Sequence, residues 1–459
     1  MMQMDGLFCS RPKRDPCWEG GFDAPIVNLA IFVPISRSGL PEMRKKTDRS
    51  SIESILNSLD VSEFTYTLPP ERIAKFPLTK RDESKLLVYN KGQIHQDSFS
   101  SIRKYTNSEA LLVFNNSKVI QARIIFFKES GAKIEIFCLE PADPPDIHVS
   151  FQETRSVTWR CLVGNQKKWK KASLSKKLVC RGDEIVLTAS RGEISSAGTI
   201  VQFSWNNPGL TFSEVLESAG EMPIPPYLKR EAAPIDRTRY QTIYSLNEGS
   251  VAAPTAGLHF SNEVIQQLRR KGVDSVELTL HVGIGTFRPI LSDSLVHHEM
   301  HTEHFSITLE SLQKIRDSVS RIIAVGTTTV RTLESLYLLG VKVYLDENIP
   351  VDKLQVNQWD GLLNETEISP VEAVKCLEEY MMERKMDTLH STTRLMIIPG
   401  YRIMMTEALI TNFHMPRSSL ILLVAGYIGN DWIRVYQFAL ENEFRFLSYG
   451  DSSILFPKS

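Results

Sequence analysis

The chain has 459 residues, more than one hydrophobic core normally supports, so two or three domains are expected. Its composition, with 42% hydrophobic and 23% charged residues, is typical of a soluble globular protein. The net charge of −1 excludes a general basic field, so any contact with a nucleic acid must come from local basic patches.

Six cysteines are scattered through the chain without a Cys-x-x-Cys pair. This argues against a disulfide scaffold, a zinc ribbon or an iron–sulfur site, and favours a reducing cytoplasm. The longest apolar run, residues 420–428, is far shorter than the roughly 20 residues that cross a bilayer. We therefore expect a cytoplasmic protein without a membrane span.

Residues 1–60 mix proline, glycine, arginine and isolated aromatics without sustained periodicity. They predict a poorly ordered N-terminal extension, with a short helix possible from Ser50 or Ser51 to Leu59. An upstream start codon would explain the same segment equally well. Beyond it the pattern tightens, and strands are expected at residues 86–89 and 111–114.

Short strands separated by turn residues fill the stretch from about 124 to 205. This pattern predicts a small β-barrel or sandwich, with strands at residues 134–139, 159–163, 184–189 and 198–205. A basic loop there surrounds Trp169 with Lys167, Lys168, Lys170 and Lys171. Lysines beside an aromatic suit a phosphate backbone and an unstacked base, although a solvated hairpin tip explains the loop as well.

Strand-like and helix-like segments alternate after residue 226, which predicts a layered α/β domain. The segments are residues 276–282, 321–325, 329–339, 395–398, 418–427 and 432–443. Residues 341–388 read as a helical insertion, a surface helix added to the core. Ser369 as N-cap, Pro370 at the first helical position and Glu372 as the capping-box partner mark its start.

Residues 249–260 are rich in small side chains and almost uncharged. Small residues allow close approach of the backbone to another surface. Thr255 and His259 are the polar side chains in its second half that could contact a ligand. The stretch is either a tight packing turn or a ligand-binding loop.

Two histidine-containing segments follow. His281 lies near a strand end before a Gly-x-Gly, but the missing third glycine and Pro289 exclude a dinucleotide-binding turn. Residues 297–304 hold the densest titratable cluster, which includes His301 and Glu303. Its spacing lacks the H-E-x-x-H pattern of zinc proteases. Two interpretations of the cluster stay open: general acid–base catalysis and a solvated polar turn.

Three further junctions carry polar residues of the kind that bind ligands. Thr327 and Thr328 lie at the start of a helix that follows a strand. The free N–H groups of that helix start either bind an anion or are capped by the threonine side chains. Asn412 and His414 lie at another strand end, and Arg445, Tyr449 and Asp451 lie near the C-terminus. Several such junctions in one α/β domain indicate a ligand site.

These segments together resemble the S-adenosylmethionine:tRNA ribosyltransferase-isomerase family of queuosine biosynthesis. The resemblance runs in family order from about Phe64 to the end, outside the extension and the 341–388 insertion. It is carried by Arg81-Asp-Glu-Ser-Lys-Leu-Leu-Val88, Leu111-Leu-Val-Phe-Asn-Asn-Ser-Lys-Val-Ile120, Met222-Pro-Ile-Pro-Pro-Tyr227, Tyr240-Gln-Thr-Ile-Tyr244, Val251-Ala-Ala-Pro-Thr-Ala-Gly-Leu-His-Phe260, Leu280-His-Val-Gly-Ile-Gly-Thr-Phe287, His298-Glu-Met-His-Thr-Glu303, Ala324-Val-Gly-Thr-Thr-Thr-Val-Arg-Thr-Leu-Glu-Ser335, Thr411-Asn-Phe-His-Met-Pro416 and Arg445-Phe-Leu-Ser-Tyr-Gly-Asp451.

The resemblance implies a multi-domain α/β fold. A layered α/β sandwich domain, residues 61–123 and 226–459, would be interrupted by a small closed β-barrel, residues 124–225. The implied enzyme is a cytoplasmic monomer without a metal. It would move and isomerise the ribosyl group of S-adenosylmethionine onto 7-aminomethyl-7-deazaguanine at the wobble position of tRNA, giving epoxyqueuosine-tRNA, adenine and methionine.

That chemistry needs a general base beside the sulfonium and a hydrogen-bonding partner for the leaving adenine. It also needs an anion site for the methionine carboxylate and a nucleobase turned out of its stack. We expect acid–base function from His259, His281 and His301 with Glu303, and which histidine is the base stays open. Replacing His281 with Ala is expected to abolish adenine release and spare the fold. The expected substrate contacts are Thr255, Thr327, Thr328, Arg331, Asn412, His414, Tyr449 and Asp451, and the expected tRNA contacts are Lys167, Lys168, Lys170, Lys171 and Arg445.

Two rival functions remain at this stage. One is a catalytically silent tRNA-binding protein on the same scaffold, which the intact histidines argue against. The other is an ordinary methyltransferase, which predicts a glycine-rich strand-to-helix loop that the sequence lacks. The products separate these functions, because a methyltransferase releases S-adenosylhomocysteine and the transferase–isomerase releases adenine.

Overall fold

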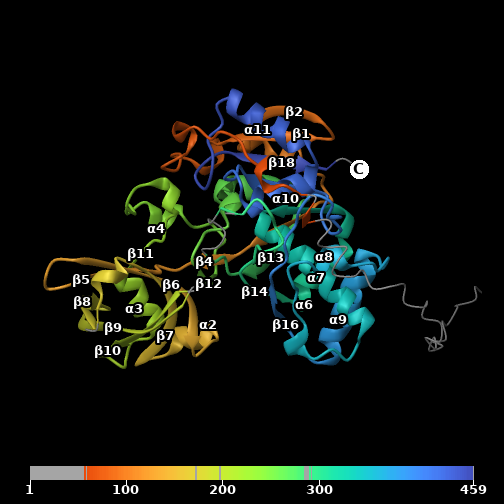
Figure 1. Ribbon diagram of the computed structural model, residues 1–459. Helices are drawn as coiled ribbons and strands as arrows, with labels where there is room; N and C mark the ends of the chain where they lie inside the picture. Colours follow the sequence, from red (N-terminus) through yellow and green to blue (C-terminus); the bar gives the residue numbers. More distant parts are fainter. Residues whose placement is uncertain are drawn as a thin grey trace, which may run out of the picture. The chain divides into compact units, whose positions relative to one another are not determined.

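The computed structural model describes residues 56–57, 59–170, 173–195, 198–283, 289–290 and 292–457 (Figure 1). These residues belong to one compact unit, residues 47–459. Most of the predicted extension, residues 1–60, lies outside them, and so does most of the helix predicted up to Leu59.

The larger sheet has nine strands in the order β16-β14-β13-β3-β15-β17-β18-β1-β2. Its centre is parallel, with β13, β3, β15 and β17 side by side, and β18 runs antiparallel to β17 but parallel to β1. The strands are β1 (Lys85–Asn90), β2 (Gln93–Ser98), β3 (Leu111–Asn115), β13 (Asp274–Leu280), β14 (Glu303–Thr308), β15 (Ile322–Val325), β16 (Thr388–Thr393), β17 (Ala408–Asn412) and β18 (Ser452–Phe456).

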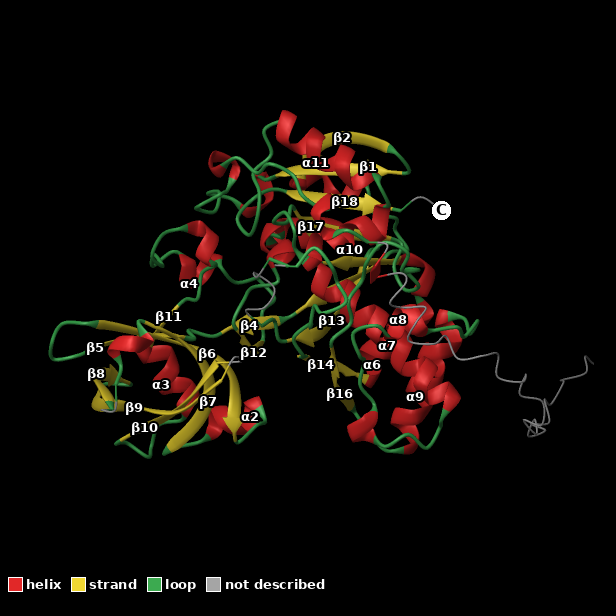
Figure 2. Cartoon of the chain, in the orientation of Figure 1, coloured by secondary structure: helices red, strands yellow, loops and turns green. Residues whose placement is uncertain are grey.

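Both faces of this sheet are covered, which explains the continuous apolar runs of its central strands. In β3, Leu111 and Val113 belong to one core, whereas Leu112 and Phe114 belong to the core on the opposite face. Helices α6, α7 and α9 pack together on the first face (Figure 2). The helices of this part are α5 (Asn262–Arg270), α6 (Leu309–Asp317), α7 (Thr327–Leu345), α8 (Asp360–Leu363), α9 (Pro370–Glu383), α10 (Ser419–Ile428) and α11 (Asp431–Glu441).

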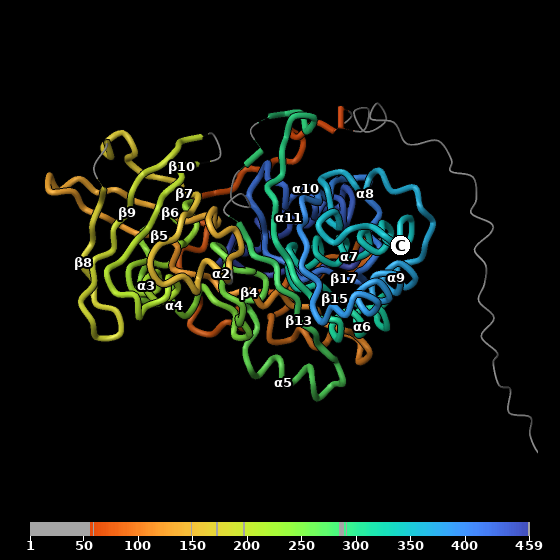
Figure 3. Tube along the Cα trace, turned by 90° about the horizontal axis from the view of Figure 1, so that it is seen from below, coloured from red at the N-terminus to blue at the C-terminus, as the bar shows by residue number. Residues whose placement is uncertain are grey.

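The second sheet has seven antiparallel strands in the order β11-β5-β6-β7-β10-β9-β8. It curls around helix α3 (Phe212–Ala219), which contacts β5, β8 and β11 (Figure 3). Its core contains Trp159, Trp169 and Phe212. The strands are β5 (Arg123–Phe127), β6 (Lys133–Asp143), β7 (Ser156–Gly164), β8 (Leu174–Cys180), β9 (Asp183–Ser195), β10 (Gly198–Trp205) and β11 (Gly220–Glu221), with α2 (Ile147–Gln152) beside them.

The closed barrel expected from the resemblance is not confirmed. Among the described residues no ladder joins β8 to β11 or β5, so the sheet is a half-barrel with two ends. The mixed α/β class with several sheets is confirmed. The expected domain limits at residues 124 and 225 stay a prediction, although β5 and β11 begin and end this sheet close to them.

Two sequence expectations about the layered part were wrong. Residues 395–398 form no strand or helix, although Leu395 and Ile398 are fully buried. The helix expected to end at 339 continues as α7 to Leu345, inside the predicted 341–388 insertion. The helix start at Ser369 is confirmed, since its hydroxyl accepts a hydrogen bond from the Glu372 N–H, and α9 then packs on α7.

No helix in the described ranges combines the length and the apolar character needed to cross a membrane. The longest of them, α7, owes its burial to neighbouring elements of the fold, among them β3, β13 and α9.

Glu334 is a buried carboxyl group in the middle of α7. It accepts hydrogen bonds from the Tyr401 hydroxyl at 3.0 Å and from the N–H groups of Met404 and Met405 at 3.0 and 2.9 Å. Burial raises its pKa to about 7, and these hydrogen bonds only partly oppose the rise. The folded chain therefore holds this proton at pH values where the unfolded chain, with an ordinary pKa of 4.5, has lost it.

This difference gives a testable dependence of stability on pH. Because the folded state binds the extra proton, the free energy of unfolding should fall by about 3 kcal/mol as pH rises from about 4.5 to about 7, and no further above that. Urea unfolding of the wild type and Glu334→Gln at several pH values measures it. The difference between the two curves should carry this slope; a difference independent of pH would contradict the assignment.

Candidate active site

A hollow lies where the loop around Thr255, the start of α7 and the end of β17 meet. It encloses about 780 Å³ of empty space, counted out to the open solvent. Small and apolar residues form most of its wall, including Ala252, Pro254, Val282 and Leu447. The polar residues expected from the sequence that line it are Thr255, Thr327, Thr328, Asn412 and His414.

The loop that begins this wall is short and tightly packed. It is the 3-10 turn η7 (Thr255–His259), whose residues 256–259 are buried. Gly257 is needed there for space, because a Cβ atom at this position would lie 1.9 Å from the Tyr244 hydroxyl oxygen. The stretch 249–260 is therefore both a packing turn and a wall of the hollow.

Asn412, the last residue of β17, is the centre of the polar network behind the hollow. Its Nδ2 donates to the backbone carbonyls of Leu447 at 3.1 Å and Asp451 at 3.5 Å, and to Nε2 of His259 at 3.1 Å. The two carbonyls fix the amide with its NH₂ group toward them. His259 Nε2 is then an acceptor, and its Nδ1 carries the proton and donates to the Ser84 hydroxyl at 2.8 Å.

The other end of the amide points the opposite way. Asn412 is 3% exposed, and its Oδ1 is buried without a hydrogen-bond partner within the part of the chain that the structure describes. An unpaired buried acceptor is costly, so such a group usually serves a ligand or a structural water. Asn412 lines the hollow, and Oδ1 is the acceptor that this residue has left over.

Both histidines next to Asn412 are uncharged at neutral pH. Burial lowers the pKa of His259 to about 3, and the positive charges of Arg445 and Arg81 add to this effect. Burial alone lowers the pKa of His414 to about 3. His414 Nε2 lies 2.9 Å from the Thr411 hydroxyl. At neutral pH these imidazoles are therefore uncharged hydrogen-bonding groups and not imidazolium ions.

The start of α7 offers backbone donors to the hollow. Gly326 precedes the helix with φ +101°, a conformation that suits glycine, and it leads into Thr327 and Thr328. The first amides of a helix have no carbonyl partner within the helix, and the helix dipole favours a negative group there. A negatively charged group is favoured at this corner.

A second cluster lies one turn further along α7. Arg331 and Glu303 form a buried ion pair, with side chains 5% and 1% exposed. Glu303 Oε1 also accepts from Nε2 of His301 at 3.1 Å. Burial alone would raise the pKa of Glu303, but Arg331 and His301 outweigh it and lower the pKa to about 2. The carboxylate therefore stays charged and holds both partners.

This cluster opens into its own small hollow. His301 and Arg331 line it together with Leu395 and Leu420, and Leu420 also lines the main hollow. His301 additionally lies beside Gly283, whose Cβ would come 3.4 Å from the imidazole. With Nε2–H held by Glu303, the Nδ1 lone pair is the basic position of this ring.

Three other expected site residues also lie outside the lining of the main hollow. His281 packs against Gly249, where a Cβ atom would lie 2.7 Å from its Nδ1. Tyr449 donates to Asp236 at 2.7 Å. Asp451 accepts from the N–H groups of Lys85 and Arg445 and from the Arg445 side chain. Tyr449 and Asp451 thus anchor the turn that carries Leu447 and Ser448 into the hollow.

A family model described as queuosine biosynthesis protein matches residues 61–455. The relatives named S-adenosylmethionine:tRNA ribosyltransferase-isomerase from Thermoanaerobacter sp. (strain X514) and Thermotoga petrophila are each 37% identical, over 86% of this chain and 99% and 100% of theirs. The chain belongs to this family. It is thereby a transferase–isomerase enzyme of queuosine biosynthesis, as the resemblance indicated.

The chain is also similar to a solved structure. It is the S-adenosylmethionine tRNA ribosyltransferase from Thermotoga maritima, 28% identical, covering 86% of this chain and 100% of its own, with a TM-score of 0.40.

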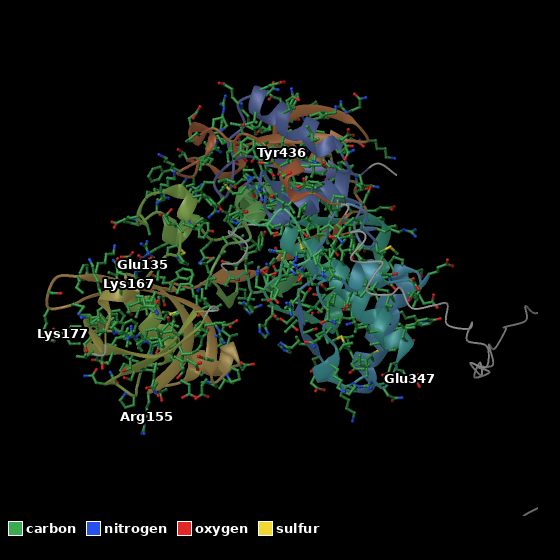
Figure 4. The ribbon with its side chains drawn as sticks, viewed as in Figure 1. Glu135, Arg155, Lys167, Lys177, Glu347 and Tyr436 are labelled. Carbon is green, nitrogen blue, oxygen red and sulfur yellow. The ribbon has the colours of Figure 1, made fainter. Side chains whose placement is uncertain are left out.

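The basic loop expected to contact tRNA lies in the seven-stranded sheet (Figure 4). Lys167 and Lys168, in the turn η5 (Gln166–Lys168), are exposed, and so is Lys170, whereas Lys171 lies outside the described residues. Trp169 is only 1% exposed and belongs to the core of that sheet. Trp169 therefore does not present its ring to an unstacked base, and the lysines of this loop stay the predicted tRNA contacts.

Two groups near the site are not among the residues predicted from the sequence. Ser84 holds His259, and Arg81 donates to the Leu258 carbonyl at 3.2 Å. Both lie in the quoted Arg81-Asp-Glu-Ser84 segment, so the motif was the available signal. Among the described residues, no group of three His, Cys, Asp or Glu side chains is arranged to hold a metal ion.

Proposed function

We propose that this enzyme transfers and isomerises the ribosyl group of S-adenosylmethionine onto 7-aminomethyl-7-deazaguanine at the wobble position of tRNA. The products are epoxyqueuosine-tRNA, adenine and methionine, and S-adenosylmethionine is consumed as co-substrate without a metal. The enzyme works as a cytoplasmic monomer. The observation that carries the proposal is the buried Asn412 Oδ1 in the main hollow of a chain of this family.

We assign the main hollow to the adenine of S-adenosylmethionine and the entering deazaguanine. Both carry an exocyclic amino group, and Asn412 Oδ1 is an acceptor for such a group. Thr255 and His414 line the same wall and supply further polar contacts. His259 contributes by holding Asn412, because its ring nitrogens already face Asn412 and Ser84.

The methionine carboxylate of the co-substrate fits the start of α7. Thr327 and Thr328 provide the backbone donors, and Arg331 lies one turn further along the helix. Arg331 Nη2 is a buried donor without a partner in the described part of the chain, although Glu303 neutralises most of the guanidinium charge. Arg331 therefore supplies an oriented N–H donor at this end of the site and little net positive charge.

The base that removes the proton beside the sulfonium is best matched by His301. Glu303 orients its ring and leaves Nδ1 to accept a proton, and the imidazolium formed is stabilised by the same carboxylate. His281 is the remaining candidate. Tyr449 and Asp451 support the wall from behind.

The proposal keeps the family's domain division. Residues 61–123 and 226–459 form the layered catalytic domain, and residues 124–225 form the inserted domain around the half-barrel sheet. Lys167, Lys168, Lys170 and Lys171 of the inserted domain, together with Arg445 of the catalytic domain, contact the tRNA backbone.

Replacing Asn412 with Ala tests the assignment of the main hollow. Adenine release from S-adenosylmethionine in the presence of amine-bearing tRNA should fall by about 10²-fold or more, because a site built to hydrogen-bond its substrate loses that contact. The variant also loses about 1–3 kcal/mol of stability, since His259 and two carbonyls lose their donor. Adenine is quantified by chromatography below the unfolding temperature of the variant.

Asn364→Ala is the matched control. Asn364 donates to the Tyr337 hydroxyl at 3.1 Å and is outside the lining of the hollow. This variant should release adenine at the wild-type rate. Wild-type turnover by a folded Asn412→Ala variant would exclude the assignment, and a wild-type chain that binds tRNA but releases no adenine would favour the silent tRNA-binding protein.

A further inference from the structure

A second hollow, behind Asn412, is lined by three arginines. Arg81, Arg239 and Arg445 face it together with His259, Ser448 and Tyr449. The arginines come from three distant parts of the chain, and each is partly exposed. A group from outside the protein can therefore reach them.

The positive charge of this hollow is largely uncompensated. Arg81 donates to the carbonyls of Leu258 and Thr238, and Arg239 donates to those of Thr79 and Leu78. Among the described residues neither forms an ion pair with a carboxylate, whereas Arg445 pairs with Asp451 at 3.0 Å. Carbonyls satisfy guanidinium N–H groups without cancelling their charge.

Further features indicate that an anion belongs here. Arg239, which lines the hollow, keeps a buried Nε donor without a hydrogen-bond partner in the described residues. Burial, and next the nearby Arg239, lower the pKa of Arg81, as expected for two like charges held close together. A phosphate, with several acceptor oxygens and a negative charge, relieves both conditions.

The arginine hollow and the main hollow share a wall. Ser448 lines both, and His259, which lines the arginine hollow, accepts from Asn412, which lines the main one. The base and the phosphate of one nucleotide are separated by its ribose, so two adjoining hollows of this kind can hold both ends of a flipped nucleotide.

We propose that Arg81, Arg239 and Arg445 bind a backbone phosphate of tRNA that flanks the nucleotide whose base enters the main hollow. This inference rests on the proposed function and adds the site of backbone recognition to it. Arg81 and Arg239 thereby join Arg445 as tRNA contacts, and the phosphate fixes the register of the flipped nucleotide.

The test uses the full-length enzyme and anticodon stem-loop RNAs that carry the 7-aminomethyl base. In two of the RNAs, the phosphate on the 5′ or the 3′ side of the modified nucleotide is a neutral methylphosphonate. With one of them the wild-type KM for RNA should rise roughly tenfold, while the KM for S-adenosylmethionine stays unchanged. No variant has to fold for this arm.

The second arm adds Arg239→Gln and its matched control Arg270→Gln, an exposed arginine on α5 outside these hollows. Arg239→Gln should raise the KM for the RNA with ordinary phosphates roughly tenfold. It should also lower, by about one unit, the slope of the logarithm of the binding constant against the logarithm of the salt concentration. The methylphosphonate should also cost this variant less than it costs the wild type, because one of the three arginine partners of the phosphate is already lost. Arg270→Gln should behave as the wild type does.

Several outcomes would overturn the inference. These are a wild-type KM unchanged by either methylphosphonate, or effects of Arg239→Gln and the methylphosphonate that multiply independently. Inorganic phosphate that competes with RNA, while both methylphosphonates are silent, would assign the hollow to free phosphate instead. If the stem-loop that carries the 7-aminomethyl base and only ordinary phosphates gives no adenine release, the proposed function itself is refuted. The two failures are therefore distinct.

Discussion

Replacing Glu303 with Ala is expected to lower the free energy of unfolding by about 3–5 kcal/mol, which makes it one of the most damaging single substitutions in the chain. Glu303 is buried and is the carboxylate partner of the buried Arg331. Without it, the guanidinium keeps its bond to the Leu395 carbonyl but has no opposite charge in a dry environment. Urea unfolding followed by circular dichroism measures the loss.

The double variant Glu303→Ala with Arg331→Met is the control for this interpretation. Removing both charges eliminates the unpaired guanidinium, so the double variant should be clearly more stable than Glu303→Ala alone. A single variant that loses less than about 1 kcal/mol would contradict the prediction, as would a double variant no more stable than the single one.

Replacing His301 with Ala should lower the rate of adenine release by about 10²–10⁴-fold, the usual range for loss of a general base. The KM for S-adenosylmethionine should change little, because the imidazole acts on the proton and does not carry the binding. The protein should remain folded, since the Glu303–Arg331 pair is still present. Single-turnover adenine release gives the rate of the chemical step.

Two further histidine variants make this result specific. His304→Ala removes an exposed imidazole from β14, which begins just after His301, and should leave turnover unchanged. His281→Ala removes the other candidate base. A loss of 10²-fold or more in His281→Ala, with His301→Ala close to wild type, would contradict the assignment of His301 and make His281 the base.

The layered part of the fold was largely predictable because its central strands are buried on both faces. The apolar runs at β3 and β15 are read directly from the sequence, and so are the helices α10 and α11. The strand β14 was missed because it starts in the histidine-rich segment, and alternate side chains, such as that of His304, face solvent. The spacing of the histidines there predicts a titratable cluster and masks the alternation typical of a strand.

Burial and hydrogen bonding are different properties, and only the first is visible in composition. Leu395 and Ile398 are fully buried, yet their backbone pairs with no strand, so the run was misread as a regular element. Trp169 differs in burial from the residues beside it. Its lysine neighbours are exposed, but the indole faces the core of the curled sheet.

The candidate site was predictable where polar residues follow strands. Asn412 and Thr327 were found in this way, since strand ends of a parallel sheet meet at one edge. Contacts between distant segments were not predictable from spacing. The bond from His259 to Ser84 joins residues 175 positions apart, and the arginine hollow combines three such segments.

The central claim is that this chain transfers the ribosyl group and releases adenine. Its most direct test supplies S-adenosylmethionine labelled in the ribose, together with tRNA bearing the 7-aminomethyl base, and follows the label and the free base. The account predicts ribose label in the tRNA and one free adenine for each label transferred. Label that stays in S-adenosylhomocysteine, or labelled tRNA without free adenine, would contradict it.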